Sequence, residues 1–85
     1  MHQLNRLISE FCPDNIKAFT HAVESYFLRD GKMVRISHLG PADNGQHRFM
    51  LDFANKHDAM NTYSQLGSAT CILFGYNALI LRVGA

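Results

Sequence analysis

Residues 47–59 read HRFMLDFANKHDA, and this stretch decides the fold. Within 47–53 large apolar side chains alternate with a second, more polar set, and a period of two predicts a β-strand with one buried and one open face. The buried set is Phe49, Leu51 and Phe53, and the open set is Arg48, Met50 and Asp52. Asn55 then stands where a side-chain oxygen can accept a hydrogen bond from the first turn of a helix, so a helix is predicted over 56–66.

A second helix is predicted upstream, over residues 16–28. Its apolar residues recur at spacings of three and four, which produces one apolar stripe along a helix. Asp14 or Asn15 can cap the first turn, and Gly31 stands just past the end, where a left-handed conformation is favoured. The stripe consists of Ile16, Phe19, Val23 and Phe27.

Strands are predicted on either side of that helix. Residues 32–39 alternate, and the turn formers of 40–45 predict a loop that joins them to 47–53. Residues 4–11 are short and mixed, and they fit either a strand or a helical turn. We favour a strand, because Pro13 and the Asp and Asn after it mark a break and the start of the next helix. A shift of one residue would turn every side chain of this strand to the other face.

The end of the chain predicts a short strand over 71–74 and a last strand over 78–83, after Gly67 ends the helix. The order is therefore β-α-β-β-α-β, with a small extra strand before the last. This order predicts an α+β fold in which two helices cover one face of a four-stranded antiparallel sheet. The 85 residues form one domain, 1–85. The uncovered face is where we expect the function.

Charge and composition narrow the possible functions. A net charge of +1, with 47% hydrophobic and 18% charged residues, fits a globular protein. Non-specific affinity for nucleic acid comes from phosphate neutralisation, so a chain this close to neutral needs a local cluster of Lys and Arg. No apolar run approaches the roughly 20 residues of a membrane helix, and no apolar core of a secretory signal opens the chain. We expect an intracellular protein, in nucleus or cytoplasm, without membrane contact.

Neither a cofactor nor catalysis is expected of this domain alone. Cys12 and Cys71 lie far apart and are expected to be free, reduced thiols. The five histidines lack the spacing of a zinc site, so no metal is expected. No Ser-His-Asp set, glycine-rich phosphate loop or carboxylate pair is recognisable. A parent chain could still be an enzyme.

Several stretches together resemble the RNA recognition motif family. RFMLDF at 48–53, KHDA at 56–59 and LG at 66–67 are similar to the family's aromatic-rich strand and the helix after it. DGKMV at 30–34 and LRVGA at 81–85 are similar to the family's passage into its second strand and to its last strand. The resemblance covers nearly the whole chain. It implies a ferredoxin-like βαββαβ sandwich whose sheet contacts single-stranded RNA.

The positions that the family uses to stack RNA bases are not aromatic in this sequence. The family's third-strand signature places aromatic residues where this chain has Arg48 and Met50, and its first-strand signature places one at Ile8. Since each stacked base contributes about 1–3 kcal/mol, the resemblance implies weak RNA binding. Arginine can stack on a base or clamp a phosphate instead. The expected RNA-binding residues are Ile8, Arg35, Arg48, Met50 and Arg82.

Two narrower resemblances imply different functions. The long helix over 16–28, the missing aromatics and CILFGYNAL at 71–79 look like the N-terminal recognition-motif domain of eukaryotic RNA-dependent RNA polymerases. That likeness implies a weak or accessory RNA-binding module of a larger RNA-processing or RNA-silencing protein. Some likeness to the homodimerising recognition motif of nuclear-pore proteins implies a protein-interaction or homodimerisation module instead. An open face with Met50, Ile8 and Ile80 also suits a protein partner, because methionine adapts to varied surfaces.

Overall fold

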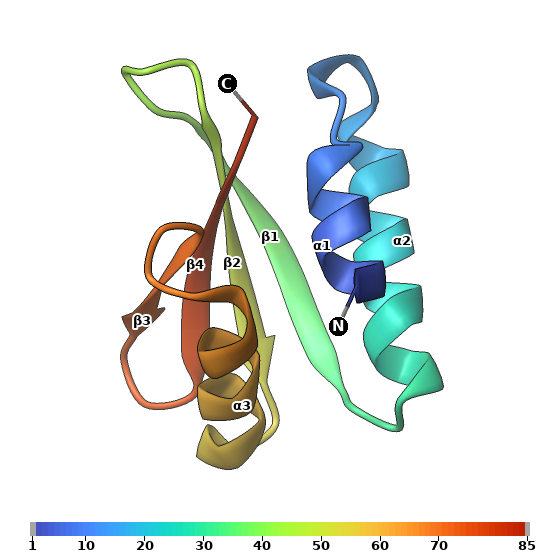
Figure 1. Cartoon of the computed structure of the whole chain (residues 1–85), viewed down its shortest axis with the longest axis vertical. Helices are drawn as coiled ribbons and strands as arrows, with labels where there is room; N and C mark the ends of the chain where they lie inside the picture. The colour runs from blue at the N-terminus through green and yellow to red at the C-terminus, as the bar shows by residue number, and fades with distance from the viewer. Residues whose placement is uncertain (1, 85) are drawn as a thin grey trace.

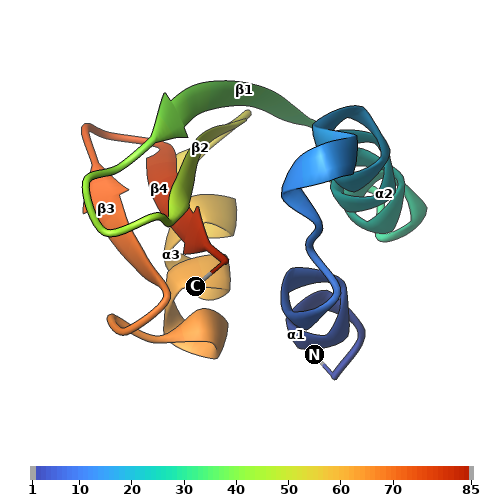
Figure 2. The same cartoon turned by 90° about the horizontal axis from the view of Figure 1, so that it is seen from above.

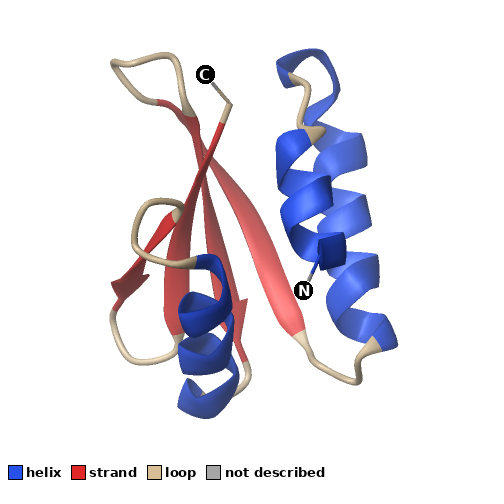
Figure 3. Ribbon diagram, viewed as in Figure 1, coloured by secondary structure: helices blue, strands red, loops and turns tan. Residues whose placement is uncertain are grey.

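The computed structural model describes residues 2–84, except for the side chain of His2. These residues form helices and a sheet of four strands (Figures 1 and 3). The helices are α1 (His2–Ser9), the short 3-10 helix η1 (Pro13–Asn15), α2 (Ile16–Arg29) and α3 (Lys56–Leu66). The strands are β1 (Val34–Pro41), β2 (His47–Phe53), β3 (Cys71–Phe74) and β4 (Ala78–Val83).

The four strands form one antiparallel sheet in the order β1-β2-β4-β3. Two strands close in sequence, β1 and β2, pair at one side, and β3 and β4 pair at the other, while β2 also pairs with β4. The β1–β2 register shifts between His38 and Gly40, where β1 carries a bulge. The two central strands, β2 and β4, pair on both sides without a register shift between them, so their alternation defines the two faces of the sheet.

The helices lie on one face of the sheet. Figure 2 shows α3 and the α1–α2 pair on the concave side, with β1 and β3 at the two margins. The core forms between these helices and the inward residues of the strands, and burial of its apolar surface is the main stabilising term. Its members are Leu4, Phe19, Val23, Phe27, Phe49, Leu51, Phe53, Ala59, Cys71, Leu79, Leu81 and Val83.

The helices predicted over 16–28 and 56–66 are confirmed within a residue. In α2, Phe19, Val23 and Phe27 of the predicted stripe are buried and Ile16 is half-buried. Oδ1 of Asn15 accepts a hydrogen bond of 3.3 Å from the Ala18 N–H. In α3, Oδ1 of Asn55 accepts a bond of 2.9 Å from the Asp58 N–H. Gly67 ends α3 with φ at 86°, a left-handed conformation that a side chain would disfavour. Local capping chemistry therefore explains where both helices begin.

The strand predicted over residues 4–11 is wrong, because residues 4–9 belong to helix α1 and the last two residues form a turn and a loop. Leu4, Leu7 and Ile8 recur at spacings of three and four, which places them on one side of a helix. Leu4 is 1% exposed and belongs to the core, and Ile8 is half-buried against it. A short segment with three apolar residues fits the period of a strand as well as that of a helix. The helix forms here because it buries Leu4 under the sheet.

The βαββαβ succession is consequently not confirmed. Residues 2–84 run α-α-β-β-α-β-β, with α1 in place of a first strand. The last strand β4 pairs directly with β2, and the short strand β3, expected as a minor addition, completes the four-stranded sheet. The broader expectation is confirmed: the fold is α+β, with a four-stranded antiparallel sheet and helices on one face.

Candidate functional site

The uncovered face of the sheet carries most of the residues that the sequence singled out. Directly opposite residues of antiparallel strands point to the same face, so the ladders define three rows across the strands. We call this surface the open face. Its members are Arg35, Ser37, Arg48, Met50, Asp52, Ile72, Phe74, Ala78, Ile80 and Arg82.

The first row of the open face brings two arginines together. Arg48 on β2 lies opposite Arg82 on β4. Nη2 of Arg82 donates a hydrogen bond of 2.8 Å to the carbonyl of Ser68, in the loop before β3. Nε of Arg82 is buried and has no hydrogen-bond partner within residues 2–84. Neither arginine forms an ion pair in that part of the chain, so two positively charged residues without a carboxylate partner occupy opposite positions of the ladder, with Arg48 exposed.

The second row is apolar over three of its four positions. Met50 lies between Ser37 on β1 and Ile80 on β4, and Ile80 lies opposite Ile72 on β3. Met50 and Ile80 are half-buried, and Ile72 is 43% exposed. An apolar strip therefore runs from the middle of the sheet to the β3 margin.

The third row combines a charged end with an aromatic end. Arg35 lies opposite Asp52, Asp52 lies opposite Ala78, and Ala78 lies opposite Phe74. Phe74 is 50% exposed. Because Asp52 stands beside Arg35, the net positive charge of the open face is concentrated in the first row.

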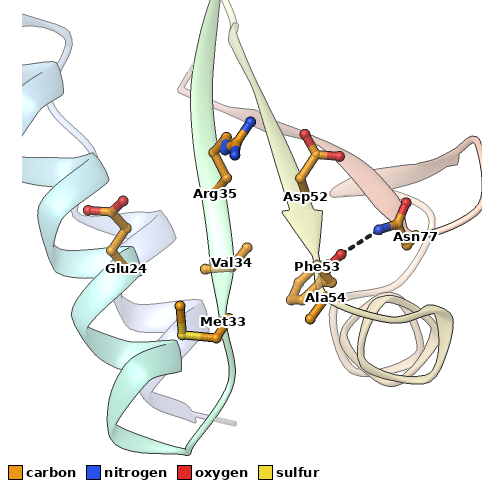
Figure 4. Close-up of a pocket in the computed structure, with 8 residues that line it drawn as sticks. All are labelled: Glu24, Met33, Val34, Arg35, Asp52, Phe53, Ala54 and Asn77. Carbon is orange, nitrogen blue, oxygen red and sulfur yellow. Dashed lines mark hydrogen bonds between the residues drawn. The ribbon is translucent and has the colours of Figure 1, made fainter.

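An open pocket of about 690 Å³ adjoins the charged end of the third row (Figure 4). Glu24 approaches it from α2, while Arg35 and Asp52 project from neighbouring strands. At its floor, the side-chain amide of Asn77 donates to the carbonyl of Phe53, whose own N–H donates to the Asn77 carbonyl over 2.9 Å. With two carboxylates around one guanidinium, this pocket disfavours an anion. Its remaining lining residues are Met33, Val34, Phe53 and Ala54.

Four of the five expected RNA-binding residues lie on the open face, and Ile8 does not. Arg35, Arg48, Met50 and Arg82 come from β1, β2, β2 and β4. Ile8 lies in α1 and packs on the core from the helix layer, because its segment is helical. It lines a separate pocket of about 460 Å³ near the end of β4, which Arg82 also reaches. Ile8 is therefore not part of the open face with the other four expected residues.

Two open-face residues were missed from the sequence. Phe74 is half-exposed on the open face and Ile72 lies beside it, and neither is among the contact residues expected from the sequence. The apolar run at 71–74 shows no alternation, so nothing in it indicated which residues would point outward. The signal that could have found them is the pairing of β3 with the alternating strand β4.

Outside the open face, the described residues contain few groups that could act in catalysis or bind a metal ion. No group of three or more His, Cys, Asp or Glu side chains in residues 3–84 is arranged to hold a metal ion. His38 Nε2 and His47 Nδ1 are 3.0 Å apart, on the helix-covered side next to the rings of Phe11 and Phe49. Cys71 is a free thiol in the core, and burial raises its pKa although the Arg82 charge opposes this. Within the described chain, no helix is long and apolar enough to cross a membrane.

Comparisons of the chain with protein-family models, with curated proteins and with solved structures found no match. Fold and surface chemistry therefore define the class of this protein: a small α+β domain with an arginine-bearing open sheet face.

Proposed function

We propose that this domain binds single-stranded RNA weakly, through the open face, as an accessory module of a larger RNA-processing or RNA-silencing protein. One observation carries the proposal: Arg48 and Arg82 lie directly opposite each other with no carboxylate paired to either within residues 2–84. Like charges directly opposite each other on a sheet are destabilising. A local conflict of this kind is expected where a ligand relieves it, and a phosphate is the ligand that two guanidinium groups favour.

The two arginines have different roles in the proposed complex. The Ser68 carbonyl holds the Arg82 guanidinium in one orientation, so less side-chain entropy is lost when a phosphate binds beside it. Arg48 is exposed and free to close on the same phosphate. Arg35 contributes less, because Asp52 lies opposite it and Glu24 shares its pocket.

The bases would lie over the apolar strip towards β3. Phe74 offers a half-exposed ring, and stacking of one base on an aromatic ring contributes about 1–3 kcal/mol. Met50, Ile80 and Ile72 offer apolar contact without hydrogen-bonding groups. Few polar side chains are available to read base edges, so we expect little sequence preference.

Fluorescence anisotropy with a short labelled oligouridine at low salt tests this proposal. The anisotropy should saturate as protein is added. The slope of the logarithm of the association constant against the logarithm of the salt concentration should be about −1 to −2, since a single strand releases about 0.7 counterion per neutralised phosphate. Arg48→Gln should raise the Kd about fivefold, or about 1 kcal/mol, while Arg29→Gln, the same charge change on α2, should change it little. Absence of saturation, or equal effects of the two variants, would contradict the proposal.

A second function, protein interaction, is favoured by a separate observation. Three consecutive residues of the margin strand β3, Ile72, Leu73 and Phe74, are exposed to 43%, 43% and 50%. Exposed apolar residues in a row mark contact sites more often than isolated ones do. In this alternative the domain is a protein-interaction or homodimerisation module, and its contact includes the β3 margin.

A further inference from the structure

The two margins of the sheet are protected differently. An unpaired edge strand can pair with another chain, and natural proteins block this with charges, proline, bulges or a covering element. Each margin has a neighbouring helix, α2 beside β1 and α3 beside β3, but the β1 margin also has the other three: Arg35, Pro41 and the bulge at His38 and Gly40. The β3 margin consists of Cys71, Ile72, Leu73 and Phe74, without charge, proline or register shift, and Figures 1 and 2 show it at the outer side of the sheet.

The segment that contains β3 carries no charge of its own, and the charges nearest to it lie towards its two ends: Arg82 next to Cys71, and Lys56 with its ammonium 5.5 Å from the Tyr76 ring. Residues 59–81 contain no Asp, Glu, Lys, Arg or His. When two identical surfaces meet, every charged residue near the axis faces a like charge, which costs stability. A neutral edge avoids this cost, so it is well suited to a second copy of the same chain.

The hydrogen bonds around β4 reveal which backbone groups of β3 are free. In an antiparallel ladder, residues that bond to the neighbouring strand alternate with residues whose N–H and C=O point away. The Arg82 N–H donates to the Thr70 carbonyl over 2.9 Å, so residues 70, 72 and 74 bond to β4. Cys71 and Leu73 consequently point their backbone groups outward. The Cys71 N–H is already bonded to the Gly67 carbonyl over 3.3 Å, which leaves its carbonyl and both groups of Leu73 available.

We infer that two copies of this chain associate by antiparallel pairing of β3 with β3, with Leu73 on the two-fold axis. An axis perpendicular to the sheet keeps the two open faces on the same side, and it pairs Leu73 with the partner's Leu73. The two Leu73 residues then exchange N–H···O=C bonds. In the same register, the Gly75 N–H reaches the carbonyl of the partner's Cys71, so the available backbone groups are satisfied.

Side chains fit this register on both faces. On the open face, Ile72 lies opposite the partner's Phe74, and the apolar strips of the two copies become continuous. On the other face, Leu73 meets the partner's Leu73. Each of these side chains is 43–50% exposed in the single chain, so pairing covers apolar surface that nothing else in residues 2–84 covers. The contact is smaller than a standard interface, so we predict a weak dimer whose Kd is micromolar or higher.

This inference rests on the second proposed function and is independent of RNA binding. Sedimentation velocity from micromolar to millimolar protein tests it. The unmodified chain should dimerise reversibly, Leu73→Lys should be monomeric, and Leu28→Lys, the same change at an exposed leucine of α2, should still dimerise. Leu73→Glu alone should also be monomeric, but an equimolar mixture of Leu73→Lys and Leu73→Glu should form a heterodimer, because opposite charges then meet at the axis. That rescue also shows that the two variants are folded.

Three outcomes would overturn the inference: a monomer at all concentrations, a dimer that survives Leu73→Lys, or no rescue in the mixture. The anisotropy assay with oligouridine, run on Leu73→Lys, separates this result from the RNA proposal. A monomeric variant that still binds oligouridine leaves RNA binding in place whatever the fate of the dimer. If the chain dimerises through Leu73 but does not bind oligouridine, the protein-interaction proposal is supported and the RNA-binding proposal is not.

Discussion

Arg48 and Arg82 lie directly opposite each other on the two central strands, β2 and β4, near one end of each. A like-charged pair in this position costs roughly 0.2–1 kcal/mol relative to a neutral pair. We therefore predict that Arg48→Gln increases the free energy of unfolding by a few tenths of a kcal/mol at low salt while it weakens RNA binding. Urea denaturation at low and high salt measures this. The gain should shrink as salt screens the pair, and a loss of stability at low salt would show that Arg48 has a partner in solution.

Leu4 tests the helical assignment of the first segment. Its side chain is 1% exposed among the core residues, so Leu4→Ala should lower the free energy of unfolding by about 2–4 kcal/mol. Asn5→Ala, on the exposed side of the same helix, should change it by less than about 0.5 kcal/mol. Thermal or urea unfolding followed by circular dichroism distinguishes the two. If both changes were tolerated, α1 would not be part of the core.

Asn55 tests the capping that starts α3. Its Oδ1 accepts a bond of 2.9 Å from the Asp58 N–H, whereas the corresponding bond of Asn15 in α2 is 3.3 Å long. Asn55→Ala should lower the free energy of unfolding by about 1 kcal/mol. The longer bond predicts a smaller loss for Asn15→Ala. Equal losses in urea titrations of the two variants would show that bond length does not rank the caps.

The two cysteines should react at very different rates. Cys12 is exposed, whereas Cys71 lies in the core, and its burial raises the pKa of the thiol. Because only the thiolate is nucleophilic, iodoacetamide should modify Cys12 first and Cys71 only after unfolding, as read by mass spectrometry. Rapid modification of Cys71 in the folded protein would contradict the packing of β3 against the core.

The raised pKa of Cys71 also predicts how stability depends on pH. The folded state holds the thiol proton more tightly than the unfolded state, so this contribution is complete below the ordinary thiol pKa. It is lost as the pH rises through the ordinary value towards the raised one. Urea unfolding from neutral to alkaline pH should show this decline, and Cys71→Ala should flatten it.

The sequence predicted the parts of the fold that depend on local chemistry. Residues 47–53 alternate strictly, and 16–28 carry a helical stripe next to a capping residue, so each pattern had one structural solution. The segment with Leu4, Leu7 and Ile8 did not, because a few apolar residues fit a strand as well as a helix. Only the packing of Leu4 against distant strands decides between them, and that information is not local.

The candidate site was predictable to a similar extent. The placement of Arg48 and Met50 followed from the alternation in one strand. The pairing of Arg48 with Arg82 did not follow from it. This pairing depends on β4 lying beside β2, and the strand order would differ if residues 4–11 formed a further strand of the sheet. The exposure of Phe74 was not predictable for a related reason: a short apolar strand is buried in the middle of a sheet and half-exposed at its margin.

Mapping of amide and arginine side-chain NMR signals during titration with oligouridine tests the central claim most directly. We predict that the shifts concentrate on the open face, at Arg48, Met50, Ile80 and Arg82, and that α1 and the outer side of α2 change little. Shifts that concentrate on the helices, or no shifts at low salt and millimolar oligouridine, would contradict the claim that this face binds RNA.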